Sequence, residues 1–179
     1  MSPFGMAIVV PTLELFANEF QSSYSIIQFI ISAYLFGLAI SQPFMGFLSD
    51  KLGRKPVMIS GIILFIIASY ICMTAETLST LIVARFLQGV GGSVGTVTSR
   101  AIIRDSYSGD QAAKSLSRVT ATMGMAPMIA PVIGAIALSI SGSPNGIFLI
   151  TLLIGIMILI PVLLFLPETV IKGDLERAQ

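Results

Sequence analysis

A short charged segment, residues 46–55 (GFLSDKLGRK), constrains the fold of this chain more than any other feature of its sequence. It carries Asp50, Lys51, Arg54 and Lys55, and long runs of apolar or small residues lie on both sides of it. A cluster of charges between two such runs cannot lie in hydrocarbon. The segment therefore predicts a tight turn at a membrane face, between two membrane-spanning helices.

The composition supports a membrane protein and excludes several other classes. Hydrophobic residues make up 55% of the 179 residues and charged residues 11%, whereas soluble domains carry about 25% charged residues. The chain has no histidine, which excludes histidine-based metal sites and catalytic triads. Its formal net charge of +1 gives no reason to expect a nucleic-acid partner. We expect no enzymatic activity, no metal and no cofactor.

The apolar runs predict an all-α integral membrane protein with six spans. The first candidate is shorter than the ~20 residues that a spanning helix needs, and it contains Pro11 and Glu14. It is either re-entrant or the later part of a longer, truncated first helix, and we favour truncation. The expected spans are residues 3–18, 24–47, 56–73, 81–103, 117–140 and 147–166, followed by a polar tail at 169–179.

The distribution of basic residues predicts the orientation. Nine of the ten Lys and Arg residues lie in turns or tails that alternate spans would place on one side of the membrane, and the turns near Gln21, Glu76 and Ser141 have none. Basic residues favour the cytoplasmic side. The charged turns and the tail are therefore expected in the cytoplasm, in a multi-pass protein of the inner (plasma) membrane. Arg85 is the exception, because it lies within the 81–103 span or near its outer end.

The span at residues 81–103 has one face that is small or polar from end to end. Its members recur at steps of three and four, the spacing of one helix face: Arg85, Gly89, Gly92, Thr96 and Ser99. Gly91 and Gly95 add a GxxxG pair. No strand precedes this glycine-rich run, so close helix packing is a better interpretation than a phosphate-binding loop.

Three separate motifs resemble those of one known family. The 46–55 segment resembles the signature loop between helices 2 and 3 of the major facilitator superfamily. The run LIVARFLQGVGGS at 81–93 is similar to the helix 4 pattern built on R-x-x-Q-G. The run APMIAPVIGA at 126–135 is similar to the helix 5 antiporter pattern: Pro131 and Gly134 are kept, and Ala126 and Ala130 stand where that pattern has glycine. The chain resembles the branch of bacterial drug:proton antiporters that includes bicyclomycin and chloramphenicol resistance proteins.

The resemblance implies the N-terminal six-helix bundle of a major facilitator transporter, a 3+3 inverted repeat, with helix 1 truncated and the C-terminal half absent. It implies a secondary transporter that exports small, mostly apolar drugs or metabolites in exchange for protons, and that is inactive without its other half. The expected partners are a small-molecule substrate, protons, the lipid bilayer and that C-terminal half. An importer of small metabolites, or a natural half-length membrane protein with a structural role, are the alternatives.

The resemblance also implies a proton-coupling role for Arg85, whose charge would keep a nearby carboxylate ionised. The branch often has an aspartate in helix 1 seven residues before a proline, where this chain has Phe4. Glu14 could take its place. The alternatives are an Arg85 side chain that extends to the outer headgroups and a Glu14 that only lies at an interface.

Charges of the signature loop are expected to form a cytoplasmic latch that holds the two halves together in the outward-open state. Its members are Gly46, Asp50, Gly53, Arg54, Lys55 and Asp105, with Asp105 as the partner of Arg54. The alternative is a solvated turn. Gln28, Ser32 and Gln88 are candidates for lining a substrate cavity, or equally for making interhelical hydrogen bonds.

Overall fold

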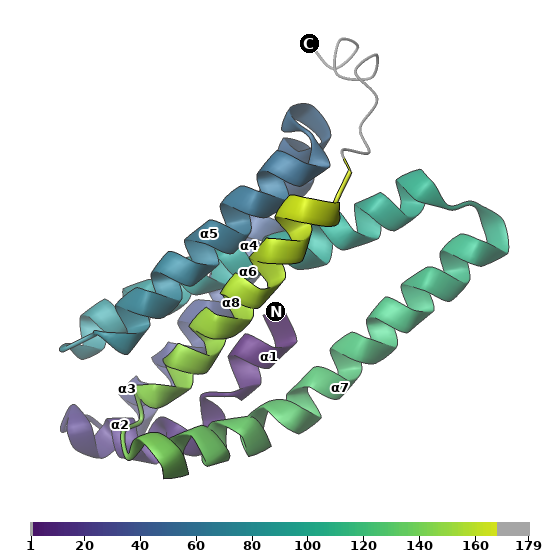
Figure 1. Cartoon of the computed structure of the whole chain (residues 1–179). Coiled ribbons are helices and arrows are strands. Elements are labelled where there is room, and N and C mark those ends of the chain that lie inside the picture. The colour runs from purple at the N-terminus through teal and green to yellow at the C-terminus, as the bar shows by residue number, and fades with distance from the viewer. Residues whose placement is uncertain (1, 168–179) are drawn as a thin grey trace.

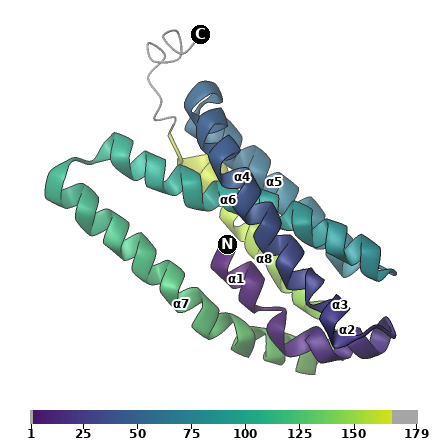
Figure 2. The same cartoon turned by 180° about the vertical axis from the view of Figure 1, so that it is seen from behind.

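The computed structural model describes residues 2–167, and all the regular secondary structure within that range is helical (Figures 1 and 2). The expected cytoplasmic tail at 169–179 lies outside the described residues. In chain order the elements are α1 (Ser2–Ala7), the 3₁₀ helix η1 (Val10–Thr12), α2 (Leu13–Glu19), α3 (Tyr24–Ile27), α4 (Phe29–Leu52), α5 (Arg54–Met73), α6 (Leu78–Ser106), α7 (Gly109–Ser141) and α8 (Gly146–Phe165).

Five segments of the described chain are long and apolar enough to cross a membrane: Tyr24–Leu52 (α3 and α4 together), α5, α6, α7 and α8. The prediction of an all-α integral membrane protein is thus confirmed. The helices extend beyond the predicted spans at their charged ends, since α6 continues to Ser106 and α7 begins at Gly109. Hydropathy identifies only the part of a helix that lies in lipid, and charged residues can continue the same helix into the aqueous layer.

The N-terminal segment is not one helix but three short pieces, α1, η1 and α2. The break surrounds Pro11, which has no backbone N–H to donate and fixes its own φ angle. The Val9 carbonyl oxygen accepts from both the backbone N–H and the hydroxyl of Thr12, at 3.0 Å and 2.8 Å, and these bonds close the turn around the proline. The predicted 3–18 span therefore corresponds to a broken segment.

Glycines bring α6 close to both α4 and α5. A methyl group at Gly89 would overlap the Tyr34 carbonyl oxygen of α4, and one at Gly91 would lie 2.6 Å from the Phe65 backbone nitrogen of α5. A methyl group at Gly95, by contrast, would meet no atom within 4 Å. Close packing of α6 is confirmed, but only the first glycine of the GxxxG pair takes part in it.

Helix α7 lies apart from α4 and α5 and packs mainly against α1 and η1 of the N-terminal segment, with smaller contacts to α6 and α8 (Figures 1 and 2). Its buried residues are Ala130, Gly134 and Ala137. A methyl group at Gly134 would collide with the Ile8 carbonyl oxygen. Ala130 and Gly134 of the antiporter pattern thus lie where α7 is packed, while Ala126 and Pro131 are half-buried beside them.

Candidate functional site

Arg85 is completely buried, at 0% exposure, in the middle of the bundle. Its three nitrogens donate to acceptors on two neighbouring helices and on its own: Nε to the Ile30 carbonyl oxygen at 3.3 Å, Nη1 to Gln88 Oε1 at 2.6 Å, and Nη2 to the Gly5 carbonyl oxygen at 3.0 Å. The side chain therefore points into the bundle and does not extend to the lipid headgroups.

The local folding of α1 creates one of these acceptors. Gly5 lies in the last turn of the short α1, where carbonyl groups have no helical partner. Because the chain breaks after Ala7, the Gly5 carbonyl oxygen is available to the guanidinium. The aromatic faces of Tyr34 and Phe148 complete the surroundings, with ring centroids 4.4 Å and 6.0 Å from Arg85 Cζ. Such faces attract a cation through the quadrupole of the ring.

Gln88 continues the polar network toward two further helices. Its Nε2 donates to Ser69 Oγ of α5 at 2.7 Å and to Thr151 Oγ1 of α8 at 3.2 Å. All three side chains are buried. Gln88 thus makes interhelical hydrogen bonds, the alternative to lining a substrate cavity, and it is enclosed by helices. Gln28 and Ser32 are exposed, and Ser32 Oγ donates to the Gln28 carbonyl oxygen at 3.2 Å.

Glu14 does not meet Arg85. It is exposed on α2, and within residues 2–167 no carboxylate lies within 4.0 Å of the Arg85 guanidinium. The positive charge of Arg85 is therefore balanced here only by carbonyl dipoles, an amide oxygen and aromatic rings. Such an arrangement gives each guanidinium nitrogen an acceptor but leaves the net charge of the group unneutralised.

A second arginine organises the charged end of the bundle. Arg54 Nε donates to Asp105 Oδ2 at 3.0 Å, and Nη1 donates to Ser49 Oγ at 2.7 Å and forms an ion pair with Asp50. The structure thus pairs Arg54 with Asp105, which joins the ends of α4, α5 and α6. Gly53 adopts a φ of 99°, a value that glycine allows without strain, and so lets α5 begin directly after α4.

The remaining two candidates for the latch in this loop lie against other helices of the same half. Lys55 Nζ donates to the Leu163 carbonyl oxygen at 3.1 Å, in the last turn of α8, where carbonyl groups are left without helical partners. A methyl group at Gly46 would lie 3.6 Å from Val97 of α6. Gly46 and Lys55 therefore lie against α6 and α8 of this half, with the Lys55 contact at the surface, whereas the side chain of Asp50 is 63% exposed.

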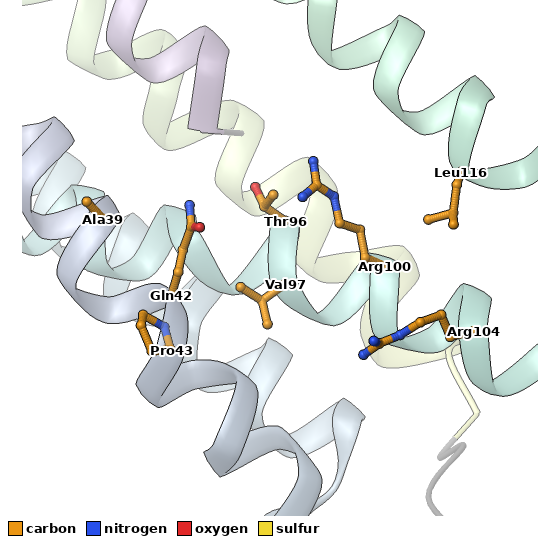
Figure 3. A pocket seen from close by; sticks show the side chains of 8 residues that line it. All are labelled: Ala39, Gln42, Pro43, Thr96, Val97, Arg100, Arg104 and Leu116. Atoms are coloured by element: carbon orange, nitrogen blue, oxygen red, sulfur yellow. The ribbon is translucent and has the colours of Figure 1, made fainter. Parts of the chain in front are cut away.

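Two open cavities lie between α4, α6 and α7. The first has a volume of about 520 Å³ and is shown in Figure 3, lined by Ala39, Gln42, Pro43, Thr96, Val97, Arg100, Arg104 and Leu116. The second, of about 460 Å³, shares Gln42, Thr96 and Arg100 with the first and extends to Pro3 and Met6 of the N-terminal segment and Met123 of α7. Gln28, Ser32 and Gln88 line neither cavity.

The sequence reasoning missed this cleft, although one signal was available. Arg100 and Arg104 are four residues apart and so share a helix face, and Thr96 lies one turn before Arg100 on the polar face that the spacing predicted. In the prediction of orientation, the two arginines serve only as bases near a turn. That α7 lies across from them is a long-range feature that the local pattern does not contain.

Comparison with known proteins identifies the family to which this architecture belongs. The family model described as Major Facilitator Superfamily matches residues 1–179. The chain is 35% identical over 170 residues to the MFS-type transporter YdgK of Bacillus subtilis, 29% over 169 residues to a bicyclomycin resistance protein homolog of Haemophilus influenzae, and 35% over 167 residues to the multidrug resistance protein MdtL of Escherichia coli. These matches cover 94%, 94% and 93% of this chain and 42% of each relative.

A solved structure has the same fold. The human organic anion transporter MFSD10 superposes with a TM-score of 0.75 at 18% sequence identity, over 97% of this chain and 46% of that one. The chain thus spans less than half the length of the relatives that it matches. With a family model matched from the first residue to the last, the three motifs and the helical architecture have one explanation: the chain belongs to the major facilitator superfamily.

Proposed function

We propose that this chain is the N-terminal half of a secondary transporter that exports small, mostly apolar drugs or metabolites across the inner membrane in exchange for protons. The observation that carries the proposal is the buried, unneutralised charge of Arg85. A charge inside a membrane bundle is unfavourable and marks an ion or substrate pathway. The relatives named for multidrug and bicyclomycin resistance support export as the direction.

In the proposed mechanism Arg85 couples the N-terminal segment to proton movement. The hydrogen bond from Nη2 to the Gly5 carbonyl oxygen ties α1 to α6. Glu14, exposed on α2 of the same segment, is the candidate proton carrier of this chain. Protonation of Glu14 changes the charge of the segment that Arg85 holds. Proton binding and the position of α1 are then linked, as alternating access requires.

The latch belongs to the same proposal. Asp105 and Ser49 hold Arg54 inside the bundle, while Asp50 is accessible to a partner. We propose that Asp50 reaches across to the second half at the cytoplasmic side in the outward-open state. The local ion pairs then preserve the geometry of the turn, and Asp50 supplies the contact that is made and broken during transport.

The proposal is tested with the complete transporter, this chain together with its second half, in proteoliposomes. Bicyclomycin is added and proton movement is followed with a pH-sensitive dye. Arg85→Lys keeps the charge but loses the planar set of donors, so bicyclomycin movement should continue with much less proton movement. Arg118→Lys, at an exposed position of α7, is the matched control. Bicyclomycin transport by the wild type without any proton movement would refute the coupling.

The proposed orientation has a separate test. Single cysteines replace Lys51 and Asp110 in a Cys72→Ser background, and intact cells are treated with a thiol reagent that does not cross membranes. Both positions should remain unlabelled until the cells are opened, because the positive-inside rule places both turns in the cytoplasm. Labelling of either cysteine from outside contradicts the orientation.

A further inference from the structure

The cleft of Figure 3 carries two arginines that no carboxylate neutralises. Arg100 and Arg104 both come from α6, and their guanidinium groups point back along that helix (Figure 3). Within residues 2–167 neither forms an ion pair or a hydrogen bond. The adjacent acid, Asp105, is engaged by Arg54 at 3.0 Å. The linings of the two joined cavities contain no acidic residue.

An anion in the cleft would relieve the repulsion between the two arginines. Both side chains are exposed, and like charges four residues apart on a helix repel each other weakly. The same cleft is apolar elsewhere, with Ala39, Pro43, Val97 and Leu116 in its lining. Volumes of about 520 and 460 Å³ fall in the range of small-molecule sites, which combine apolar walls with a few polar groups.

The position of Arg100 between the two cavities gives it a particular role. Arg100, Gln42 and Thr96 line both cavities, whereas Arg104 lines only the first. A guanidinium at the junction can hold a carboxylate, phosphonate or sulfonate through paired hydrogen bonds. The apolar body of the same molecule then has room toward Met6 and Met123 in the second cavity.

We propose that this cleft binds small amphiphilic organic anions, with Arg100 as the main contact to the anionic group and Arg104 as the second. The proposal rests on the transport function proposed above and names a substrate class for it. Neutral apolar molecules can occupy the second cavity without using either arginine. The cleft therefore distinguishes an anion from a neutral molecule of the same shape.

The test is a binding measurement with two probes of nearly the same skeleton. Anilinonaphthalene sulfonate is an amphiphilic anion, and N-phenylnaphthylamine is its neutral analogue; both fluoresce in apolar surroundings. The complete transporter is placed in nanodiscs of phosphatidylcholine, and the fluorescence of empty discs is subtracted. Arg100→Gln should weaken binding of the sulfonate by about tenfold or more, in line with the loss of a hydrogen bond to a charged group. Binding of the neutral probe should stay within about twofold.

Matched variants separate a local contact from a change in total charge. Lys114→Gln removes the same charge from an exposed position of α7 that does not line the cleft, and it should leave both probes unaffected. Arg100→Lys keeps the charge and loses the planar donors, so sulfonate binding should fall less than with glutamine. Arg104→Gln should have a smaller effect than Arg100→Gln, in the same direction.

Three results overturn the proposal. The first is that Arg100→Gln weakens both probes equally, which assigns Arg100 a structural role. The second is that it changes neither probe. The third is that phosphatidylglycerol, added to the same discs, displaces the sulfonate from the wild type, which assigns the cleft to a lipid headgroup. The measurement uses no proton gradient. A failure of anion binding therefore leaves the proposed proton coupling untouched, and a failure of proton coupling leaves the proposed anion site untouched.

Discussion

Two arginines of this molecule are buried to nearly the same extent in opposite surroundings. Arg85 is 0% exposed and Arg54 is 7% exposed. Arg54 contacts two carboxylates, those of Asp50 and Asp105. Arg85 contacts two carbonyl oxygens, an amide oxygen and two aromatic rings. Each contacts several acceptors, but only Arg54 has its charge neutralised by acids.

The difference in acceptors indicates a different role for each arginine. Arg54 and its acids form a neutralised joint at the charged end of the bundle, where the Asp105 side chain is 31% exposed and salt screens the attraction. Arg85 lies away from water, where its field is screened much less. A change of charge close to Arg85 would therefore act on it more strongly than the same change close to Arg54. The type of acceptor, more than the depth of burial, separates a structural arginine from a candidate coupling residue.

The largest loss of stability is expected from a change that moves α6 away from the acceptors of Arg85. Gly89→Ala places a methyl group onto the Tyr34 carbonyl oxygen, and two helix backbones cannot relax as a flexible side chain can. We expect it to lower the free energy of unfolding by about 3 kcal/mol. The measurement is thermal unfolding in detergent, followed by circular dichroism and by the reaction of the buried thiol of Cys72 with a fluorogenic dye.

Gly95→Ala is the matched control for that variant. It is the same substitution on the same helix, but the new methyl group meets no atom within 4 Å. Alanine favours a helix over glycine by about 1 kcal/mol, so the control should be neutral or slightly stabilising. Equal destabilisation by both variants would show that α6 does not pack against α4 as described.

The next effect concerns Arg85 itself. Arg85→Leu removes the donors but leaves the Gly5 carbonyl oxygen and Gln88 Oε1 buried without them, at a cost of about 1–3 kcal/mol in the free energy of unfolding. Arg85→Lys, which can still reach part of these acceptors, should cost less. Both are measured by the same thermal unfolding. A more stable Arg85→Leu protein would mean that the network contributes no net stability.

The comparison of the two arginines also shows how far the sequence alone could lead. Apolar runs and the charged loop were enough to predict the membrane fold, because hydropathy and charge act locally. The spacing within residues 81–103 placed Arg85 on the small and polar face of its helix. It could not show that this face is enclosed by α5 and α8, with Gln88 between Ser69 and Thr151.

Other features depend on contacts between distant parts of the chain. Gln28 and Gln88 are the same residue type in apolar surroundings, yet one is exposed and the other buried, because only Gln88 lies between α5 and α8. The acceptor at Gly5 exists only because α1 ends at Ala7. The cleft needs Leu116 of α7 to lie across from Arg100 of α6 (Figure 3). None of these is encoded in a local pattern.

A smaller effect is expected at Arg54, and it should depend on salt. Arg54→Gln removes a cation from between two acids, of which Asp50 is mostly exposed. The expected cost is about 1 kcal/mol at low ionic strength, and it should shrink in 1 M salt, where the Debye length is about 3 Å. The cost of Arg85→Leu should be unchanged by salt. Thermal unfolding at two salt concentrations measures both.

The smallest effect on stability is expected at Asp50. Asp50→Asn keeps the shape of the side chain, and this residue is 63% exposed, so the free energy of unfolding should change by less than about 0.5 kcal/mol. Its effect should appear instead in the conformational equilibrium of the complete transporter. A latch that supplies about 1–3 kcal/mol of differential contact shifts that equilibrium toward inward-open by about 5–150-fold.

The readout is a cysteine in place of Ala121, an exposed residue of α7, in a Cys72→Ser background. Its labelling rate from the cytoplasmic side should rise in Asp50→Asn and not in Asp110→Asn, which removes an equally exposed acid at the start of α7. Substrate affinity should persist, since Asp50 lines neither cavity. Unchanged labelling with normal transport would leave Arg54 and its two acids as a joint within this half alone. The contrast with Arg85 would then lie between a structural ion pair and the only conformationally coupled arginine of the two.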